Sequence, residues 1–204
     1  MKEENQAPRA RRSNATRSAE TRATLIAAAR ELFVTLGYAE TSTPEIVAAA
    51  AVTRGALYHH FADKAALFRA VVEAESAEVA AAIERAAPWA SDPMAALLAG
   101  TDAYFDAMAT PGRVRLLLLD GPAVLGPDAM AAIDRETGGG SLRAGLAASG
   151  AEGRTAAELD ALADCLSAAF DRAALAVAGG ADRGAYRGAI LRMMDAVLTE
   201  PACP

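Results

Sequence analysis

More than a quarter of this chain is alanine, the residue that favours the α-helix most strongly. Alanine occupies 55 of the 204 positions, whereas aromatic residues make up only 5%. Because strands are built mainly from β-branched and aromatic side chains, this composition favours an all-α fold. Charged residues amount to 23% and hydrophobic residues to 53%, so we expect a folded chain with a sizeable core rather than a disordered one.

The sequence also excludes several classes of protein. No uncharged apolar run approaches 18 residues, so no membrane-spanning helix is predicted, and the first residues lack the apolar segment of a secretory signal. Cys165 and Cys203 have neither the spacing of a metal site nor that of a disulfide framework, and we expect Cys165 to be a small buried residue. We therefore expect a cytoplasmic protein with no metal ion, no cofactor and no membrane partner.

Charge is distributed unevenly along the chain. The net charge is −6, but residues 1–70 carry +3 and residues 71–204 carry −9. A basic N-terminal third on an acidic body suggests a polyanionic partner for that end alone. Residues 1–18 hold four arginines among polar residues without an apolar period, which predicts a flexible basic arm. Such an arm serves either as a solubilising tail or as a segment that lies along DNA.

Four helices are predicted after this arm, and Asp63 is a good N-cap for the fourth, which is longer than the two before it. The first has an apolar face at helical spacing and ends at Gly37, which suits a left-handed cap. Ser42 and Glu45 stand three residues apart as a capping box for the second helix, and the third begins near Arg54. Short helices joined by a tight turn, at about 42–61, are typical of a helix-turn-helix DNA-binding unit.

The third helix carries the residue types that reading a major groove requires. Leu57 and Phe61 are four residues apart and can anchor its inner face. Its outer face must fit a groove about 12 Å wide, which favours small residues and hydrogen-bond donors. Arg54 can form a forked pair of hydrogen bonds with guanine, and Gly55 allows the backbone to approach the bases.

The stretch from Thr21 to Phe68 resembles the N-terminal domain of the TetR family of bacterial transcriptional regulators, most closely over Val52–Phe61 (VTRGALYHHF). The run Leu118–Gly126 resembles a common C-terminal subgroup of that family. The resemblance implies an all-α homodimer of about nine helices, with a helix-turn-helix domain at 19–78 and a larger ligand-binding and dimerisation domain at 79–204.

The resemblance also implies roles for individual residues. The recognition helix would span Thr53–His60, and Tyr58, His59 and Lys64 would lie near phosphates. A lysine at a helix N-terminus is unfavourable unless an anion is nearby, which agrees with that role for Lys64. The predicted DNA contacts are Thr43, Thr53, Arg54, Gly55, Ala56, Tyr58, His59 and Lys64.

The turn before the recognition helix departs from the family pattern. Family members usually have Ala-Gly-Val there, whereas this chain has Ala50, Ala51 and Val52. If the middle residue needs a positive φ, Ala51 adds roughly 1 kcal/mol of strain. This substitution leaves open a helical interaction protein that has lost DNA binding.

The rest of the chain is predicted to consist of helices separated by proline and glycine. The helices are expected at about 93–109, after Thr110-Pro111-Gly112, at 155–178 and at 182–199; the breaks are expected at Gly121-Pro122, Gly126-Pro127 and Gly138–Gly140. The last two helices are rich in alanine and allow close approach, so they are predicted to form a four-helix bundle between two copies of the chain. The alternative is that they pack only within their own chain.

Large apolar side chains in the C-terminal region are candidates for a ligand pocket, although each would also serve as ordinary core. They are Trp89, Tyr104, Phe105, Met108, Leu117 and Phe170. Asp102 and Asp106, four residues apart, are interpreted as a solvated face. His59 and His60 point about 100° apart on a helix and lack further ligands, so no metal site is predicted.

The sequence therefore predicts a sequence-specific DNA-binding transcriptional regulator, namely a repressor that a small-molecule ligand releases from operator DNA. The alternative is a helical small-molecule-binding protein or enzyme without DNA binding. The sequence contains no evident nucleophile–base pair and no cofactor fingerprint, which argues against an enzyme. Both histidines fall in the recognition helix.

Overall fold

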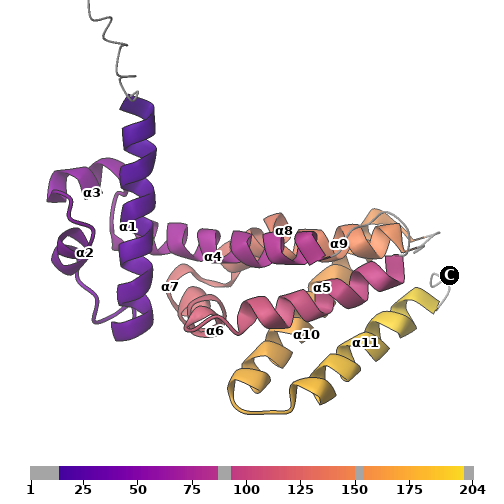
Figure 1. Cartoon of the computed structure of the whole chain (residues 1–204). Helices are drawn as coiled ribbons and strands as arrows, with labels where there is room; N and C mark the ends of the chain where they lie inside the picture. Colours follow the sequence, from indigo (N-terminus) through magenta and orange to yellow (C-terminus); the bar gives the residue numbers. More distant parts are fainter. Residues whose placement is uncertain (1–13, 87–92, 150–153, 200–204) are drawn as a thin grey trace, which may run out of the picture.

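The structure is a computed structural model that describes residues 14–86, 93–149 and 154–199. All regular elements in these ranges are helices, which confirms the predicted all-α fold. Figure 1 shows a small head built around the upright helix α1, and a larger body of crossing helices, with α4 running from the head into the body. Within the same ranges, no helix is both long and apolar enough to cross a lipid bilayer.

The helices have the following bounds. The head contains α1 (Asn14–Leu36), α2 (Thr43–Ala49), α3 (Arg54–His60) and the start of α4 (Lys64–Ala86). The body adds α5 (Pro93–Met108), α6 (Arg113–Arg115), the π-helical turn η1 (Leu116–Asp120), α7 (Gly121–Leu125), α8 (Pro127–Glu136), α9 (Gly138–Ala148), α10 (Ala156–Ala178) and α11 (Arg183–Thr199). The described residues thus form more segments than the nine helices expected, because the stretch from α6 to α9 is divided into short pieces.

The head is held together by side chains that point inward from all four of its helices. Phe33 of α1 and Phe68 of α4 meet edge to face with their ring centroids 5.1 Å apart. Ile46 of α2 is completely buried beside them, and the predicted anchors Leu57 and Phe61 are 0% and 5% exposed. Burial of each such side chain stabilises the fold by roughly 1.5–3 kcal/mol, so the apolar positions fix how α3 is presented.

The predicted helix ends in the head are confirmed. Gly37 follows α1 with φ +87°, and Ser42 and Glu45 form both halves of the capping box at α2. The carboxylate of Asp63 accepts a hydrogen bond of 2.7 Å from the N–H of Ala66 in the first turn of α4. These local signals operate within a few residues, which is why the sequence alone located them.

The N-terminal boundary is different from the one predicted. The flexible arm was expected to extend to residue 18, but Asn14–Ser18 already belong to α1. This first part of α1 is almost entirely exposed and buries no apolar face, so the periodicity that revealed the rest of the helix is missing here. The remaining arm, residues 1–13, lies outside the described residues.

Two of the predicted breaks in the body are also wrong in detail. The backbone continues from η1 directly into α7 at Gly121, because the following Pro122 lies in the first turn, where no N–H is needed. The interruption between α8 and α9 lies at Thr137, with φ −130° and ψ −112°, whereas the three glycines begin α9. Gly126 does form a break, with φ +84°.

The last two helices occur where the sequence predicted them. Phe170 of α10 and Met194 of α11 are buried in a second hydrophobic core in the body. Cys165 is exposed instead of buried, and Met193 is 45% exposed. Both side chains point away from the rest of their own chain.

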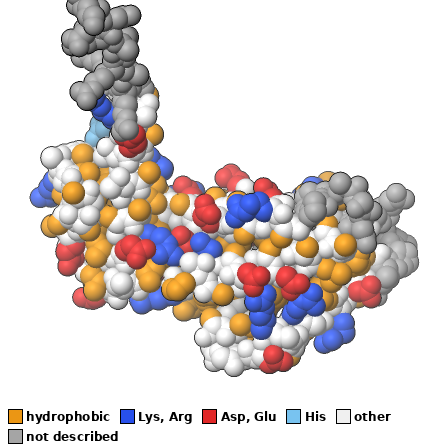
Figure 2. All heavy atoms as spheres, viewed as in Figure 1, with side chains coloured by type: hydrophobic (Ala, Val, Ile, Leu, Met, Phe, Trp, Pro, Cys, Tyr) orange, Lys and Arg blue, Asp and Glu red, His pale blue; other side chains and the backbone are white. Residues whose placement is uncertain are grey.

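The pair of aspartates on α5 joins two helices. Arg187 binds Asp102 through two hydrogen bonds of 2.5 and 2.8 Å, and Arg183 binds Asp106 at 2.6 Å. Figure 2 shows acidic and basic side chains side by side on this face of the body. Because α11 supplies two arginines at the same spacing of four residues, the two carboxylates are paired rather than merely solvated.

Candidate nucleic-acid interface and internal cavity

The helix α3 lies on the outside of the head, where it is accessible to a large partner (Figure 1). Thr53 caps it by accepting a 3.1 Å hydrogen bond from the N–H of Ala56. The side chain of Leu57 points into the core, and Ala56 is partly covered. The exposed residues of this segment are Thr53, Arg54, Gly55, Tyr58 and His59, which leaves the predicted reading face open to solvent.

Three of the predicted contacts come together as one surface cluster. The guanidinium of Arg54 lies 5.5 Å from the ring centroid of Tyr58, whose side chain is 43% exposed. Hydrogen bonds with Thr43, at the start of α2, and with Arg54 lower the pKa of the Tyr58 phenol. The cluster thus combines the beginnings of both helices of the helix-turn-helix and presents donors and a cation in one place.

Lys64, a predicted phosphate contact, is half-buried, and its ammonium donates hydrogen bonds within the protein. Its ammonium donates hydrogen bonds of 2.9 Å to the carbonyls of Tyr38 and Thr41, and it lies 4.3 Å from the centroid of the Tyr38 ring. The carbonyl of Ala39 is 3.5 Å away. Because an ammonium has three donors, Lys64 serves to hold the turn between α1 and α2 against α4.

The turn between α2 and α3 contains the strained residue that the sequence indicated. Ala51 has φ +52°, and it is the one non-glycine residue with a positive φ in the described part of the chain. The turn is closed by backbone hydrogen bonds of 3.1 Å from Ala51 to Ala48 and of 3.2 Å from Val52 to Val47. The helix-turn-helix therefore forms with alanine at this position.

The body contains a cavity of about 320 Å³ between α4, α5, η1, α8, α9 and α10. Of the predicted pocket residues, Tyr104, Met108, Leu117 and Phe170 line it. Phe105 does not, because its ring packs in the second core, with the guanidinium of Arg183 5.6 Å from its centroid. Trp89 lies outside the described residues.

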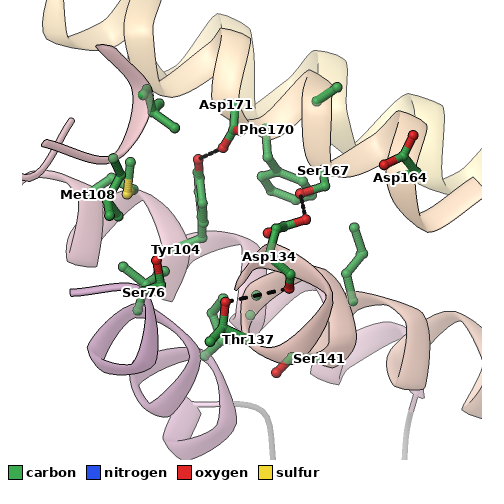
Figure 3. Close-up of a pocket in the computed structure, with 18 of the residues that line it drawn as sticks. Ser76, Tyr104, Met108, Asp134, Thr137, Ser141, Asp164, Ser167, Phe170 and Asp171 are labelled. Atoms are coloured by element: carbon green, nitrogen blue, oxygen red, sulfur yellow. Dashed lines mark hydrogen bonds between the residues drawn. The ribbon is translucent and has the colours of Figure 1, made fainter. Parts of the chain in front are cut away.

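Hydrogen bonds connect polar side chains across the wall of this cavity (Figure 3). The hydroxyl of Tyr104 donates to Asp171 at 3.1 Å, and that of Ser167 donates to Asp134 at 2.8 Å. The backbone N–H of Gly139 donates to the other oxygen of Asp134 at 3.1 Å. Burial, and then the negative charge of Asp134, raise the pKa of Asp171 to about 6. Burial and the adjacent Asp171 raise the pKa of Tyr104 well above its usual value.

A buried ion cluster joins the head to the body. Glu75 of α4 binds Arg30 of α1 and Arg113 of α6, each through an N–H···O contact of 2.7 Å. Arg113 also donates to the carbonyl of Ala107 in α5 at 2.8 Å, and Arg30 reaches the carbonyl of Pro111 at 3.3 Å. Burial alone would raise the pKa of Glu75, but the hydrogen bonds from the two arginines bring it below its ordinary value.

The sequence interpretation missed both the ion cluster and the cavity carboxylates. Glu75 occupies an apolar face of α4, three residues after Val72 and four before Val79, and an acid at such a position signals a buried partner. Ser167 and Asp171 lie four residues apart on α10 beside apolar positions. The sequence alone cannot distinguish these two polar side chains from a solvated face. They line a cavity only because α5 and α8 pack against this side of α10.

An exposed and capped recognition helix, joined by one long helix to a body with an internal cavity, defines a helix-turn-helix DNA-binding protein. A family model described as bacterial regulatory proteins of the tetR family matches residues 25–71. A second, described as a tetracyclin repressor-like C-terminal domain, matches residues 94–201, which is more than half of the chain.

Individual relatives agree with these matches. The HTH-type transcriptional regulator AcrR of Shigella flexneri is 36% identical over 100 residues, covering 48% of this chain and 46% of that protein. The HTH-type transcriptional activator FasR of Mycolicibacterium smegmatis is 33% identical over 96 residues, covering 47% of this chain and 44% of that protein. The chain thus spans about half the length of the curated relatives that it matches.

The fold agrees over almost the whole chain. The crystal structure of a TetR-family transcriptional regulator from Pectobacterium atrosepticum is 32% identical, has a TM-score of 0.67, and covers 93% of this chain and 100% of that one. The chain therefore belongs to the TetR family of bacterial regulatory proteins, which confirms the resemblance seen in its sequence. Proteins of this class are DNA-binding transcriptional regulators and not enzymes.

Proposed function

We propose that this chain is a ligand-responsive transcriptional repressor that acts in the cytoplasm on operator DNA. The observation that carries the proposal is the path of α4. Its first half contributes Leu67 and Phe68 to the core that presents α3, and its second half contributes Val79 and Ile83 to the cavity wall. A molecule that displaces the second half must therefore move or strain the support of the reading helix.

In this proposal α3 enters the major groove with its N-terminal end toward the bases. Arg54 reads a guanine through a forked pair of hydrogen bonds, and the exposed Gly55 allows close approach. Tyr58 and His59 donate to phosphate oxygens on one side, and Thr43 does so from the start of α2. Lys64 contributes indirectly, because it fixes the turn that sets the distance between α1 and α2.

We further propose that two copies pair through α10 and α11. The outer face of these helices carries small side chains together with the exposed Cys165 and Met193, and none of the residues that the structure describes covers them. Two such helix pairs would form a four-helix bundle. The two recognition helices would then meet successive major grooves of a palindromic site, with centres about 34–36 Å apart.

A ligand in the cavity changes DNA affinity only if it binds one arrangement of the two heads more tightly than the other. The ion cluster around Glu75 provides a rigid connection for this effect, since it ties α1, α4 and α6 together beside the cavity residue Ser76. Movement of α4 would therefore carry α1, and the head with it.

The proposal is tested by selecting bound sequences from random DNA with the purified chain and titrating the selected duplex at several salt concentrations. We expect a palindromic site, with affinity that falls steeply as salt rises. Arg54→Ala should cost about 1–3 kcal/mol and relax the preference at one base pair of each half-site. Absence of any selected sequence would refute DNA reading by α3.

A reporter gene placed behind the selected site decides the direction of regulation. We expect expression to fall when the chain is present, as for a repressor. Increased expression would instead indicate an activator, as the name of FasR states for that relative.

A further inference from the structure

The cavity in the body has acidic side chains in its wall and no basic ones. Asp134, Asp164 and Asp171 line it, and none of the described lining residues is Lys, Arg or His. Asp134 comes from α8, whereas the other two come from α10. Most of the remaining wall is aliphatic, aromatic or methionine, so the carboxylates are set in an apolar surface.

The two inner carboxylates have neutral partners only. Asp171 accepts from the hydroxyl of Tyr104, and Asp134 accepts from the hydroxyl of Ser167 and the N–H of Gly139. In the described ranges no ion pair includes either residue. Carboxylates elsewhere in the body, such as Asp102, do have an arginine. Burial and then the negative charge of Asp134 raise the pKa of Asp171, and no ion pair in the described ranges offsets them.

We propose that the cavity binds an organic cation: an apolar body, about the size of a substituted aromatic ring, with one positively charged amine or quaternary ammonium group. This inference rests on the proposed function, in that the cation is the effector. The positive charge would lie near Asp134 and Asp171, which both line the cavity and are close enough for the charge of Asp134 to act on Asp171 (Figure 3).

The surroundings of the carboxylates favour a cation over other ligands. The rings of Tyr104 and Phe170 meet at 5.0 Å beside Asp171 and offer aromatic faces to a positive charge. An anion would add a third negative charge to the same apolar space, and a neutral donor would leave both carboxylates uncompensated. Asp164 is exposed and lies at the solvent edge of the cavity, where it attracts cations toward the opening.

The test compares ligands with one apolar body and different charges. Para-butylbenzylamine, para-butylbenzyl alcohol and para-butylbenzoate are titrated into the full chain by calorimetry near neutral pH. We expect the amine to bind at least about tenfold more tightly than the alcohol, and the benzoate not to bind. The trimethylammonium analogue of the amine should keep this advantage, which separates charge from hydrogen-bond donation.

Single substitutions identify the groups responsible. Asp171→Asn and Asp134→Asn should each reduce the preference for amine over alcohol by about tenfold and leave the affinity for the alcohol unchanged. Asp128→Asn, at an exposed position on the same helix as Asp134 and outside the cavity wall, should change neither. Thermal unfolding of each variant verifies that it is folded, and both cavity substitutions remove a partly buried charge rather than create one.

Equal binding of amine and alcohol, preference for the benzoate, or no binding of any probe would overturn the proposed cation site. The same protein samples are titrated with the selected operator duplex. If the ligand-free protein binds the duplex but the amine fails to bind the protein, the ligand class alone is refuted, whereas failure of the ligand-free protein to bind DNA refutes the proposed function itself.

Discussion

Two residues outside α3, Ala51 and Lys64, influence how the head presents α3. Ala51 adopts a left-handed backbone conformation, and this conformation sets the direction in which α3 leaves the turn. Lys64 uses its ammonium to join the carbonyls of Tyr38 and Thr41 to the start of α4. The first residue stores strain, and the second stabilises the loop on the opposite side of α2. The orientation of α3 therefore depends on residues that lie outside α3 itself.

Replacing Ala51 by glycine should stabilise the protein. Glycine adopts a positive φ without the steric cost of a Cβ, which is roughly 1–2 kcal/mol, although it gains more freedom in the unfolded chain. We expect Ala51→Gly to raise the free energy of unfolding by about 0.5–1 kcal/mol, measured by urea denaturation. Ala48→Gly, at an exposed right-handed position in α2, should lower it by a similar amount. If both substitutions lowered the free energy of unfolding by the same amount, Ala51 would not be strained.

Asp171 makes the stability of the body depend on pH. Its pKa is raised from 3.8 to about 6 in the folded state, so the unfolded chain gives up this proton first as pH rises. The stabilisation by the protonated carboxyl is therefore complete below about pH 4 and is lost as pH rises through about 6. Asp171→Asn keeps an acceptor for the Tyr104 hydroxyl and should exceed the wild type in stability above this window, by about 3 kcal/mol at most.

Urea denaturation of both proteins from about pH 4 to 8 measures this difference. The two curves should coincide at the acidic end and separate toward neutral pH. Parallel curves would mean that the Asp171 carboxyl is compensated in the folded protein, and they would also weaken the argument for a cation in the cavity.

At the scale of helices, the sequence predicted those features that depend on interactions within a few residues. Gly37, Ser42 and the periodic apolar face of α1 are read within one or two turns, and all three are confirmed. Gly121 was misread as a stop because its small size serves a different purpose. A Cβ there would lie 3.0 Å from Met130 and from the carbonyl of Leu116. Only the packed structure reveals such a close approach, as it does the pairing of α5 with α11.

The link between head and body depends on the charge of Glu75. Glu75→Gln removes the negative charge between Arg30 and Arg113 and leaves two cations close together in a buried place. We expect a loss of about 3–5 kcal/mol in the free energy of unfolding at neutral pH, measured by urea denaturation. Folding lowers the pKa of Glu75, so its charged carboxylate stabilises the wild type at neutral pH. This stabilisation is lost as the pH falls through the pKa that Glu75 has in the folded state.

The exposed Glu78 of the same helix provides the control, and Glu78→Gln should change the free energy of unfolding by less than about 0.5 kcal/mol. A similarly small effect of Glu75→Gln would show that the cluster does not hold the head to the body. In that case the proposed transmission through α1, α4 and α6 would have no physical basis.

At the scale of the whole molecule, the proposed pairing of two copies through α10 and α11 would allow two heads to read one site. A single head offers one short helix to DNA, and its specific contacts are few. Two heads on a rigid dimer add their binding free energies and impose a spacing on the operator. The alanine-rich sequence of α10 and α11 suggested this arrangement, and the exposure of Cys165 and Met193 adds the positions at which a second copy would pack.

A charge introduced at Met193 tests the proposed dimer. Met193→Glu places a charge in the middle of the proposed bundle, where it would be buried without a partner. We expect the variant to sediment as a monomer in analytical ultracentrifugation and to lose cooperative binding to the palindrome, while it still binds a single half-site weakly. Leu36→Glu is the matched control, because Leu36 of α1 is also 45% exposed and lies in the head. If Met193→Glu remains dimeric, the two copies do not meet through this face of α11, and the spacing expected for the operator loses its structural basis.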